Sequence, residues 1–161
     1  MKEQISFSYE VFGSIDSLSE ADRQLLKKAR KVTKQAYAPY SRFFVGAAAL
    51  LQNGKTITGT NQENASSPVG LCAERVLLSA TASLYPAVPI LTIAISYINN
   101  KNGKSEHPAA PCGVCRQSLL EYELRQQHPI RLVLGAMDGK VFVISDAKAL
   151  LPLYFSGADM A

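Results

Sequence analysis

The chain has 161 residues, which is enough for one domain with a full hydrophobic core and too short for two ordinary domains. Hydrophobic residues make up 47% and charged residues 19%, and no apolar stretch approaches the roughly 18 residues of a membrane helix. The net charge is +4, but many positive charges lie in the segment 23–34, where the solvated face of a helix accounts for them. We therefore expect one domain over residues 1–161, with neither a membrane nor a nucleic acid as partner.

The first forty residues predict a strand and then a long amphipathic helix. Apolar and polar residues alternate over the first dozen positions until Gly13, which is typical of a strand. Apolar residues then recur at helical spacing over 25–36, with Ser17 or Ser19 as the capping residue. Pro39 follows the run closely, so we expect the helix to end just before it.

A hairpin and alternating helices and strands follow. The apolar run 44–51 and the segment 55–60 are joined by Asn53 and Gly54, which tolerate positive φ and favour a tight turn. The further expected elements, in chain order, are a helix over 71–85, a strand over 91–98, a helix from about 113 to 126, strands over 130–136 and 141–144, and a short helix near 146–151. Helices alternating with apolar strands predict a mixed sheet covered by helices on both faces, which is a three-layer α/β/α sandwich.

The three cysteines predict a metal site. The N-terminus lacks the contiguous apolar core of a secretory signal, so we expect the protein in the cytoplasm, where thiols stay reduced. Cys72 begins one predicted helix, and Cys112 and Cys115 begin another forty residues later. The positive end of a helix favours thiolates, and a CysXXCys pair spans one turn, so the three sulfurs can reach one cation. Three protein ligands with an open fourth position are typical of catalytic zinc.

Glu74 is the predicted proton carrier at this site. It stands two residues after Cys72, close enough to approach the fourth metal position without binding the metal. Zinc lowers the pKa of a bound water from about 15.7 towards 7, and an adjacent carboxylate can accept the proton. Three thiolates would leave the centre with a negative charge, and Arg75 and Arg116 are placed after the ligand motifs to donate to the sulfurs.

Other interpretations of the cysteines stay open from the residues alone. His107 lies five positions before Cys112 and could close a non-catalytic site of three cysteines and one histidine. The pair Cys112 and Cys115 could also be a redox motif, although this leaves Cys72 and Glu74 unexplained.

The sequence resembles a known family in several segments. Cys-Ala-Glu at 72–74 followed by Pro-Cys-X-X-Cys at 111–115 resembles the three-cysteine form of the zinc deaminase signature. The segments 39–48 and 61–66 look like those of the small, homotetrameric cytidine deaminases, and the resemblance runs from about residue 22 to Phe155. It implies a sheet of about five strands, one Zn²⁺ per subunit and a homotetramer.

The resemblance also implies a reaction and a set of substrate contacts. Zinc-bound hydroxide would attack C4 of cytidine or deoxycytidine, with Glu74 as proton shuttle, to give uridine or deoxyuridine and ammonia. The implied contacts are Asn61 and Glu63 with the ribose 3′-hydroxyl, Phe43 with the pyrimidine, Ala73 with the N3 and C4 amino edge, and Phe155 as an aromatic closing over the base, often from a neighbouring subunit.

Four features depart from the family pattern, and one of them is an N-terminal extension over residues 1–16 that the shortest relatives do not share. Phe44 stands where proline is common, Ser67 stands where many relatives have a larger residue, and the loop 99–110 differs from the shortest relatives. Because Phe44 and Ser67 bear on substrate shape or assembly, a related substrate, such as a nucleoside antibiotic or a modified cytidine, is the alternative.

Overall fold

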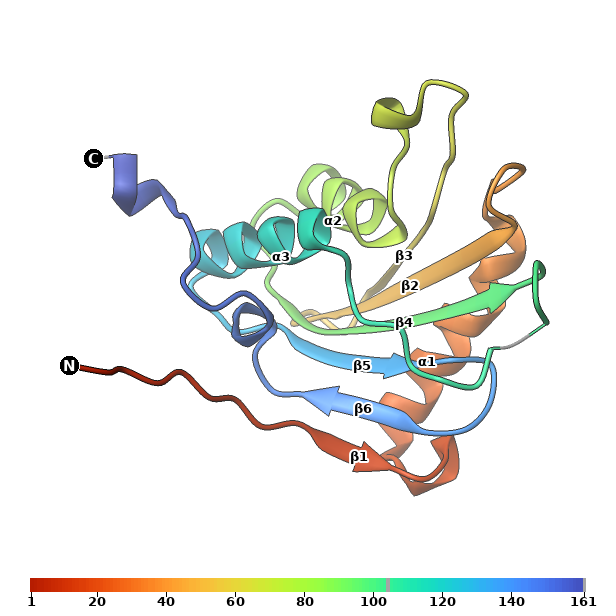
Figure 1. The fold of residues 1–161 in the computed structure, drawn as a ribbon, viewed down its shortest axis with the longest axis horizontal. Helices are drawn as coiled ribbons and strands as arrows, with labels where there is room; N and C mark the ends of the chain where they lie inside the picture. Colours follow the sequence, from red (N-terminus) through yellow and green to blue (C-terminus); the bar gives the residue numbers. More distant parts are fainter. Residues whose placement is uncertain (104, 161) are drawn as a thin grey trace.

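The computed structural model describes residues 1–103 and 105–160, and its centre is one mixed sheet of six strands (Figure 1). The strand order is β1-β6-β5-β4-β2-β3. The β4–β5 pair is parallel and the other four pairs are antiparallel. The strands are β1 (Glu10–Phe12), β2 (Phe43–Leu51), β3 (Thr56–Thr60), β4 (Ile90–Asn99), β5 (Arg131–Gly135) and β6 (Val141–Ile144).

Helices cover both faces of this sheet, which confirms the predicted three layers. One face carries α1 (Glu20–Val32), and the other carries α2 (Ala73–Leu84) and α3 (Gly113–Gln126) (Figure 1). Short 3₁₀ turns complete the fold at 15–17, 33–35, 67–69, 147–150 and 157–160. In the described part of the chain, no helix is long and apolar enough to cross a membrane.

The alternation of side chains along β2 divides the core between the two layers. Ala47 and Ala49 belong to the core beneath α2 and α3, whereas Ala48 belongs to the core beneath α1. All three are fully buried. Since successive side chains of a strand point to opposite faces, the apolar run predicted as a buried strand serves both cores.

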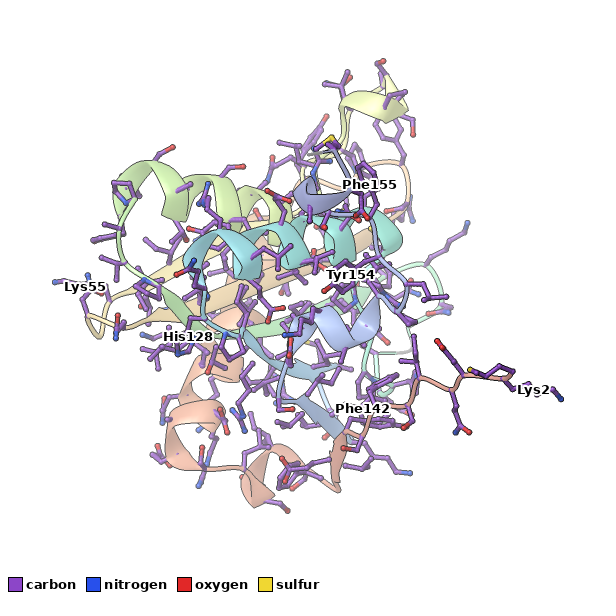
Figure 2. All side chains as sticks on the ribbon, turned by 90° about the vertical axis from the view of Figure 1, so that its left-hand side faces the viewer. Lys2, Lys55, His128, Phe142, Tyr154 and Phe155 are labelled. Atoms are coloured by element: carbon purple, nitrogen blue, oxygen red, sulfur yellow. The ribbon has the colours of Figure 1, made fainter. Side chains whose placement is uncertain are left out.

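The two N-terminal elements differ from their sequence predictions. Only Glu10–Phe12 forms a strand, at the sheet edge beside β6, while residues 1–9 stay exposed, and Figure 2 shows Lys2 far from the body. This edge strand raises the count from about five to six. Ser19 caps α1, with its Oγ accepting from the Asp22 N–H at 3.2 Å. The helix ends at Val32 rather than near Ala36, because the chain tightens into a 3₁₀ turn in which the Ala36 N–H bonds to the Thr33 carbonyl.

Gly59 in β3 lets α2 lie directly against the sheet. A Cβ at this position would lie 2.6 Å from the Leu77 nitrogen and closer still to the Ala73 carbonyl oxygen, both backbone atoms of α2. We predict that Gly59→Ala lowers the free energy of unfolding by about 2–3 kcal/mol, because the helix must move. Chemical denaturation measures this change. Gly13→Ala is the matched control, since a Cβ there meets no atom within 4 Å. Equal stability of the two variants would contradict this account of the packing.

Candidate metal centre

The three cysteines meet where α2 and α3 begin. Cys72 is the N-cap residue of α2, Cys112 is the N-cap residue of α3, and Cys115 lies buried in the first turn of α3. The Sγ atoms of Cys72 and Cys112 are 3.8 Å apart, and those of Cys112 and Cys115 are 3.5 Å apart. All three sulfurs lie within 4.8 Å of one another. The predicted convergence of two helix N-termini on one point is therefore present.

The spacing of the sulfurs fits a tetrahedral zinc ion. A Zn–S bond of about 2.3 Å in a tetrahedron places two sulfurs about 3.8 Å apart. Both measured distances are close to this value, and neither is compatible with a disulfide bond, which needs about 2.05 Å. Thiolate sulfur is a preferred zinc donor, so the donor set and its geometry both fit this metal.

The pKa shifts of Cys72 and Cys115 are also consistent with a cation site. Hydrogen bonding from Cys115 lowers the pKa of Cys72 to about 6, against the effect of burial. The same interaction, together with burial, raises the pKa of Cys115 above its usual range. The two thiols therefore shift in opposite directions, and a divalent cation at the centre would favour the deprotonated form of both.

Glu74 lies in the first turn of α2 with its side chain buried beside the sulfurs. It is 5% exposed, and burial raises the pKa of its carboxyl above the ordinary value. Its charge in turn contributes to raising the pKa of Cys115, after the larger effects of the Cys72 hydrogen bond and burial. A buried carboxyl with a raised pKa next to a metal site is suited to accept a proton and return it.

A cavity of about 490 Å³ opens onto the three cysteines and Glu74. This volume lies in the range of small-molecule sites. Its lining includes four of the predicted substrate contacts, namely Phe43, Asn61, Glu63 and Ala73. The remaining lining residues are Ser41, Val45, Gln62, Ser67, Gly70, Leu71, Ile95, Tyr97, Ala109 and Ala110. The structure therefore brings residues from four separate segments of the sequence around one pocket.

Glu63 is held at the mouth of this cavity by the preceding loop. Its Oε2 accepts from the N–H groups of Tyr40 at 2.9 Å and Ser41 at 3.3 Å. Hydrogen bonding from the Ser41 side chain is the largest of the effects that lower the pKa of the Glu63 carboxyl. The side chain is thus a fixed carboxylate acceptor, which suits a sugar hydroxyl.

The Asn61 side chain bonds to the backbone of β2, which its sequence context did not predict. Its Nδ2 donates to the Phe43 carbonyl at 2.8 Å, and its Oδ1 accepts from the Val45 N–H at 2.7 Å. The amide therefore bonds to the backbone of β2 on both sides of Phe44. One of its two amide hydrogens is committed to Phe43, which leaves the other for a ligand.

Phe155 and the two arginines lie away from the cavity of the same chain. Phe155 is 58% exposed on the C-terminal segment, where Gln117 of α3 donates to its carbonyl at 3.0 Å (Figure 2). Arg75 lines a separate groove between α2 and α3, beside Arg125. Arg116 donates to carbonyl oxygens rather than to sulfur, at 2.9 Å to Pro111 and 3.0 Å to Leu150. The interpretation of Arg116 as a sulfur donor is therefore wrong, because its guanidinium ties the C-terminal segment to α3.

The alternative of a closed site with His107 does not fit the structure. The ring of His107 packs edge-on against Phe142 of β6, with 5.7 Å between the ring centroids. Among residues 1–103 and 105–160, the three cysteines are the one close group of three or more potential metal ligands, and His107 is not in it. A zinc ion held by these three cysteines would therefore keep one ligand position for a water molecule, and the cysteines line the same cavity as Glu74.

Sequence reasoning missed one wall of the cavity. Tyr97 and Ile95 lie in the run predicted only as a buried strand, and Ala109 and Ala110 lie in the loop that was given no role. Ile95 and Tyr97 alternate along β4 in the same way as Phe43 and Val45 along β2, so all four side chains lie on one face of the sheet. Val45 is the direct partner of Tyr97. Register between the strands was the missing information, because it decides which face of β4 the site uses.

Comparison with known sequences gives a consistent result. The profile of the cytidine and deoxycytidylate deaminase zinc-binding region matches residues 19–128. The chain is 37% identical over 140 residues to a cytidine deaminase of Halalkalibacterium halodurans, which covers 86% of this chain and 98% of that protein. It is also 37% identical over 118 residues to a cytidine deaminase of Mycobacterium tuberculosis, covering 71% of this chain and 84% of that protein.

Solved structures support the same relationship. The crystal structure of a cytidine deaminase from Burkholderia pseudomallei aligns with a TM-score of 0.71 and 36% identity, over 86% of this chain and the whole of that one. A cytidine deaminase from Mycobacterium tuberculosis aligns with a TM-score of 0.62 and 32% identity, over 83% of this chain and 95% of that one. The profile covers well over half of the chain, and the match extends over 98% of the Halalkalibacterium halodurans protein and the whole of the Burkholderia pseudomallei chain. On these grounds the chain belongs to the cytidine and deoxycytidylate deaminase family.

Proposed function

We propose that this protein deaminates the free nucleosides cytidine and deoxycytidine by hydrolysis, giving uridine or deoxyuridine and ammonia. The observation that carries the proposal is the placement of three zinc-spaced sulfurs and a buried glutamate at one end of a nucleoside-sized cavity. The names of the relatives support the choice of cytidine. We assign no residue to the 2′-hydroxyl, so both nucleosides are expected to be substrates.

Cys72, Cys112 and Cys115 would hold one Zn²⁺ at the start of α2 and α3. When bound, zinc supplies Lewis acidity that makes a water molecule acidic near neutral pH. Arg75 lines the groove between α2 and α3. Its charge contributes to lowering the pKa of Cys72, after the larger effect of the hydrogen bond from Cys115. It would help the two helix N-termini to balance the negative sulfurs.

Glu74 would move the protons of the reaction. Its carboxylate would take one proton from the attacking water and deliver it to N3 of the base. It would then take the second proton from the new C4 hydroxyl and deliver it to the amino group, which leaves as ammonia as the C4 carbonyl forms. The pKa raised by burial suits this role, because an acid and base that works in both directions needs a pKa near the operating pH. The backbone of Ala73, at the first position of α2, would bind the same edge of the base.

Glu63, Asn61 and Phe43 would place the nucleoside. The fixed carboxylate of Glu63 and the remaining amide hydrogen of Asn61 suit a ribose 3′-hydroxyl, and the negative charge would repel a phosphate. The ring of Phe43 lines the cavity at the start of β2, where it can pack against the pyrimidine. These contacts favour a free nucleoside over a nucleotide.

Phe155 would act on a neighbouring subunit of a homotetramer. Its ring is exposed, and the hydrogen bond from Gln117 to its carbonyl fixes the backbone outside the cavity of its own chain. An aromatic that closes over the base must then come from another copy.

The three free cysteines suit a reducing compartment, so we place the protein in the cytoplasm.

A related aminopyrimidine nucleoside is the second candidate substrate. Ser67 lies exposed in the turn 67–69 and lines both the main cavity and a neighbouring cavity of about 430 Å³. The small side chain leaves room beside Glu63, which lines both cavities as well. This space would accept a substituent that cytidine lacks.

A spectrophotometric panel of nucleosides tests the two candidates. Loss of cytidine and deoxycytidine absorbance, abolished by a strong chelator and restored by zinc, is the expected result. Negligible turnover of both nucleosides would overturn the proposal. Faster turnover of a substituted cytidine under the same conditions would favour the second candidate.

A further inference from the structure

Tyr97 packs against Phe43, the predicted base contact in the cavity. It lies in β4, is 8% exposed, and lines the cavity together with Phe43. The two rings stack with their centroids 4.6 Å apart and their planes 19° from parallel. Because Val45 is the direct partner of Tyr97 in the sheet, Phe43 is its diagonal neighbour on the same face. One face of the Phe43 ring is therefore covered by Tyr97.

The hydroxyl of Tyr97 fixes a second wall. It donates to the His107 carbonyl at 2.8 Å, in the loop that joins β4 to α3. Ala109 and Ala110, two and three positions after His107, line the cavity, and Cys112 lies two positions further along the chain. The His107 ring packs against Phe142, so the loop is held at this residue by its backbone and by its side chain. A stacked ring with a bound hydroxyl has little freedom to rotate.

We infer that Tyr97 is a positioning residue that sets the width of the base pocket. Its ring holds Phe43 in place, and its hydroxyl holds the Ala109–Ala110 wall, so one side chain links two walls contributed by separate segments. The inference rests on the proposed function, in which the pyrimidine packs against Phe43. A rigid pocket lowers the ordering cost of binding. The contacts of Tyr97 are with Phe43 and His107 rather than with the sulfurs. Its removal should therefore weaken nucleoside binding and leave the chemical step largely intact.

Two substitutions separate the two tasks of Tyr97. Tyr97→Phe keeps the stacked ring and removes the hydrogen bond to His107, whereas Tyr97→Leu removes both. Tyr122→Leu is the matched control, because Tyr122 is also 8% exposed but lies in α3, outside the lining of this cavity. The zinc-loaded proteins are compared for KM and kcat with cytidine, for zinc content, and for amide hydrogen exchange over residues 105–111.

For Tyr97→Leu we expect KM to rise about tenfold, with kcat within about twofold and zinc content unchanged. For Tyr97→Phe we expect faster exchange over 105–111 and a KM rise of about threefold. Tyr122→Leu should change neither KM nor this exchange. The same comparison in a Glu74→Gln background gives cytidine dissociation constants by calorimetry, which should follow the KM values.

Several outcomes would overturn the inference. Unchanged KM in Tyr97→Leu, a fall confined to kcat, or an equal KM rise in Tyr122→Leu would each show that Tyr97 serves only general packing. Unchanged exchange over residues 105–111 in Tyr97→Phe would show that the Tyr97 hydroxyl does not hold this loop. If the wild-type protein does not turn over cytidine, the proposed function fails instead, and the exchange experiment still decides whether Tyr97 holds the loop.

Discussion

Glu74→Gln is expected to lower kcat for cytidine by at least about 10⁴-fold while zinc content and fold stay unchanged. A positioned acid or base contributes about 10² to 10⁴ to a rate, and Glu74 is needed for more than one proton transfer in the proposed reaction. Glutamine has the same shape and lacks the ionisable proton. It also removes a carboxyl whose burial raises its pKa, so the variant should be no less stable than the parent.

Steady-state kinetics and metal analysis on the same preparations test this expectation. Glu121→Gln makes the same chemical change on the exposed face of α3, outside the cavity, and should retain full activity. Undiminished turnover by Glu74→Gln with zinc bound would refute the role of Glu74 as proton carrier. Loss of zinc from the variant would instead make Glu74 part of the metal site.

Removal of zinc is expected to abolish deamination and to lower the melting temperature. The metal would join Cys72 at the start of α2 to Cys112 and Cys115 at the start of α3, so it links segments forty residues apart. An ion present at about 100 times its Kd stabilises a fold by about 2.7 kcal/mol. For a domain of this size, that corresponds to about 5–10 °C in melting temperature.

Calorimetry before and after dialysis against a chelator measures the stability change, and metal analysis follows the zinc content. Cys115→Ser should reproduce the loss of both zinc and activity, because Cys115 is buried and its sulfur lies 3.5 Å from that of Cys112. Zinc should restore the chelated parent protein, and magnesium should not, since magnesium prefers oxygen ligands. Full activity in zinc-free protein would contradict a catalytic metal.

The metal centre could be predicted from the sequence because its parts are local. The first turn of a helix fixes where Cys112 and Cys115 point relative to each other, and the same holds for Cys72 and Glu74. The predicted bounds of the two helices, 71–85 and about 113–126, agree with the observed bounds to within about two residues. Whether the two helix N-termini meet depends on the tertiary fold. Their meeting could still be predicted, because one metal ion needs several ligands.

The features that could not be predicted depend on which segments of the chain become neighbours in the fold. Arg116 follows a ligand motif in the sequence, but the C-terminal segment brings the Leu150 carbonyl within its reach. Tyr97 is indistinguishable from other apolar residues of β4 until the register with β2 is known. At the N-terminus, alternation over the first dozen residues overstated the strand, because only three of them find a partner in β6.

The bonds of Asn61 to β2 have a consequence for how this pocket can change. The regular ladder between β2 and β3 ends at the pair Gly46 and Thr60, and the Asn61 side chain continues it as an additional peptide group would. The residue assigned to the sugar therefore also holds the backbone of Phe43, which is assigned to the base. A change at Asn61 perturbs both halves of the nucleoside site together. Substitutions at Asn61, unlike those at Glu63 or Tyr97, are therefore expected to change sugar preference and base preference at the same time.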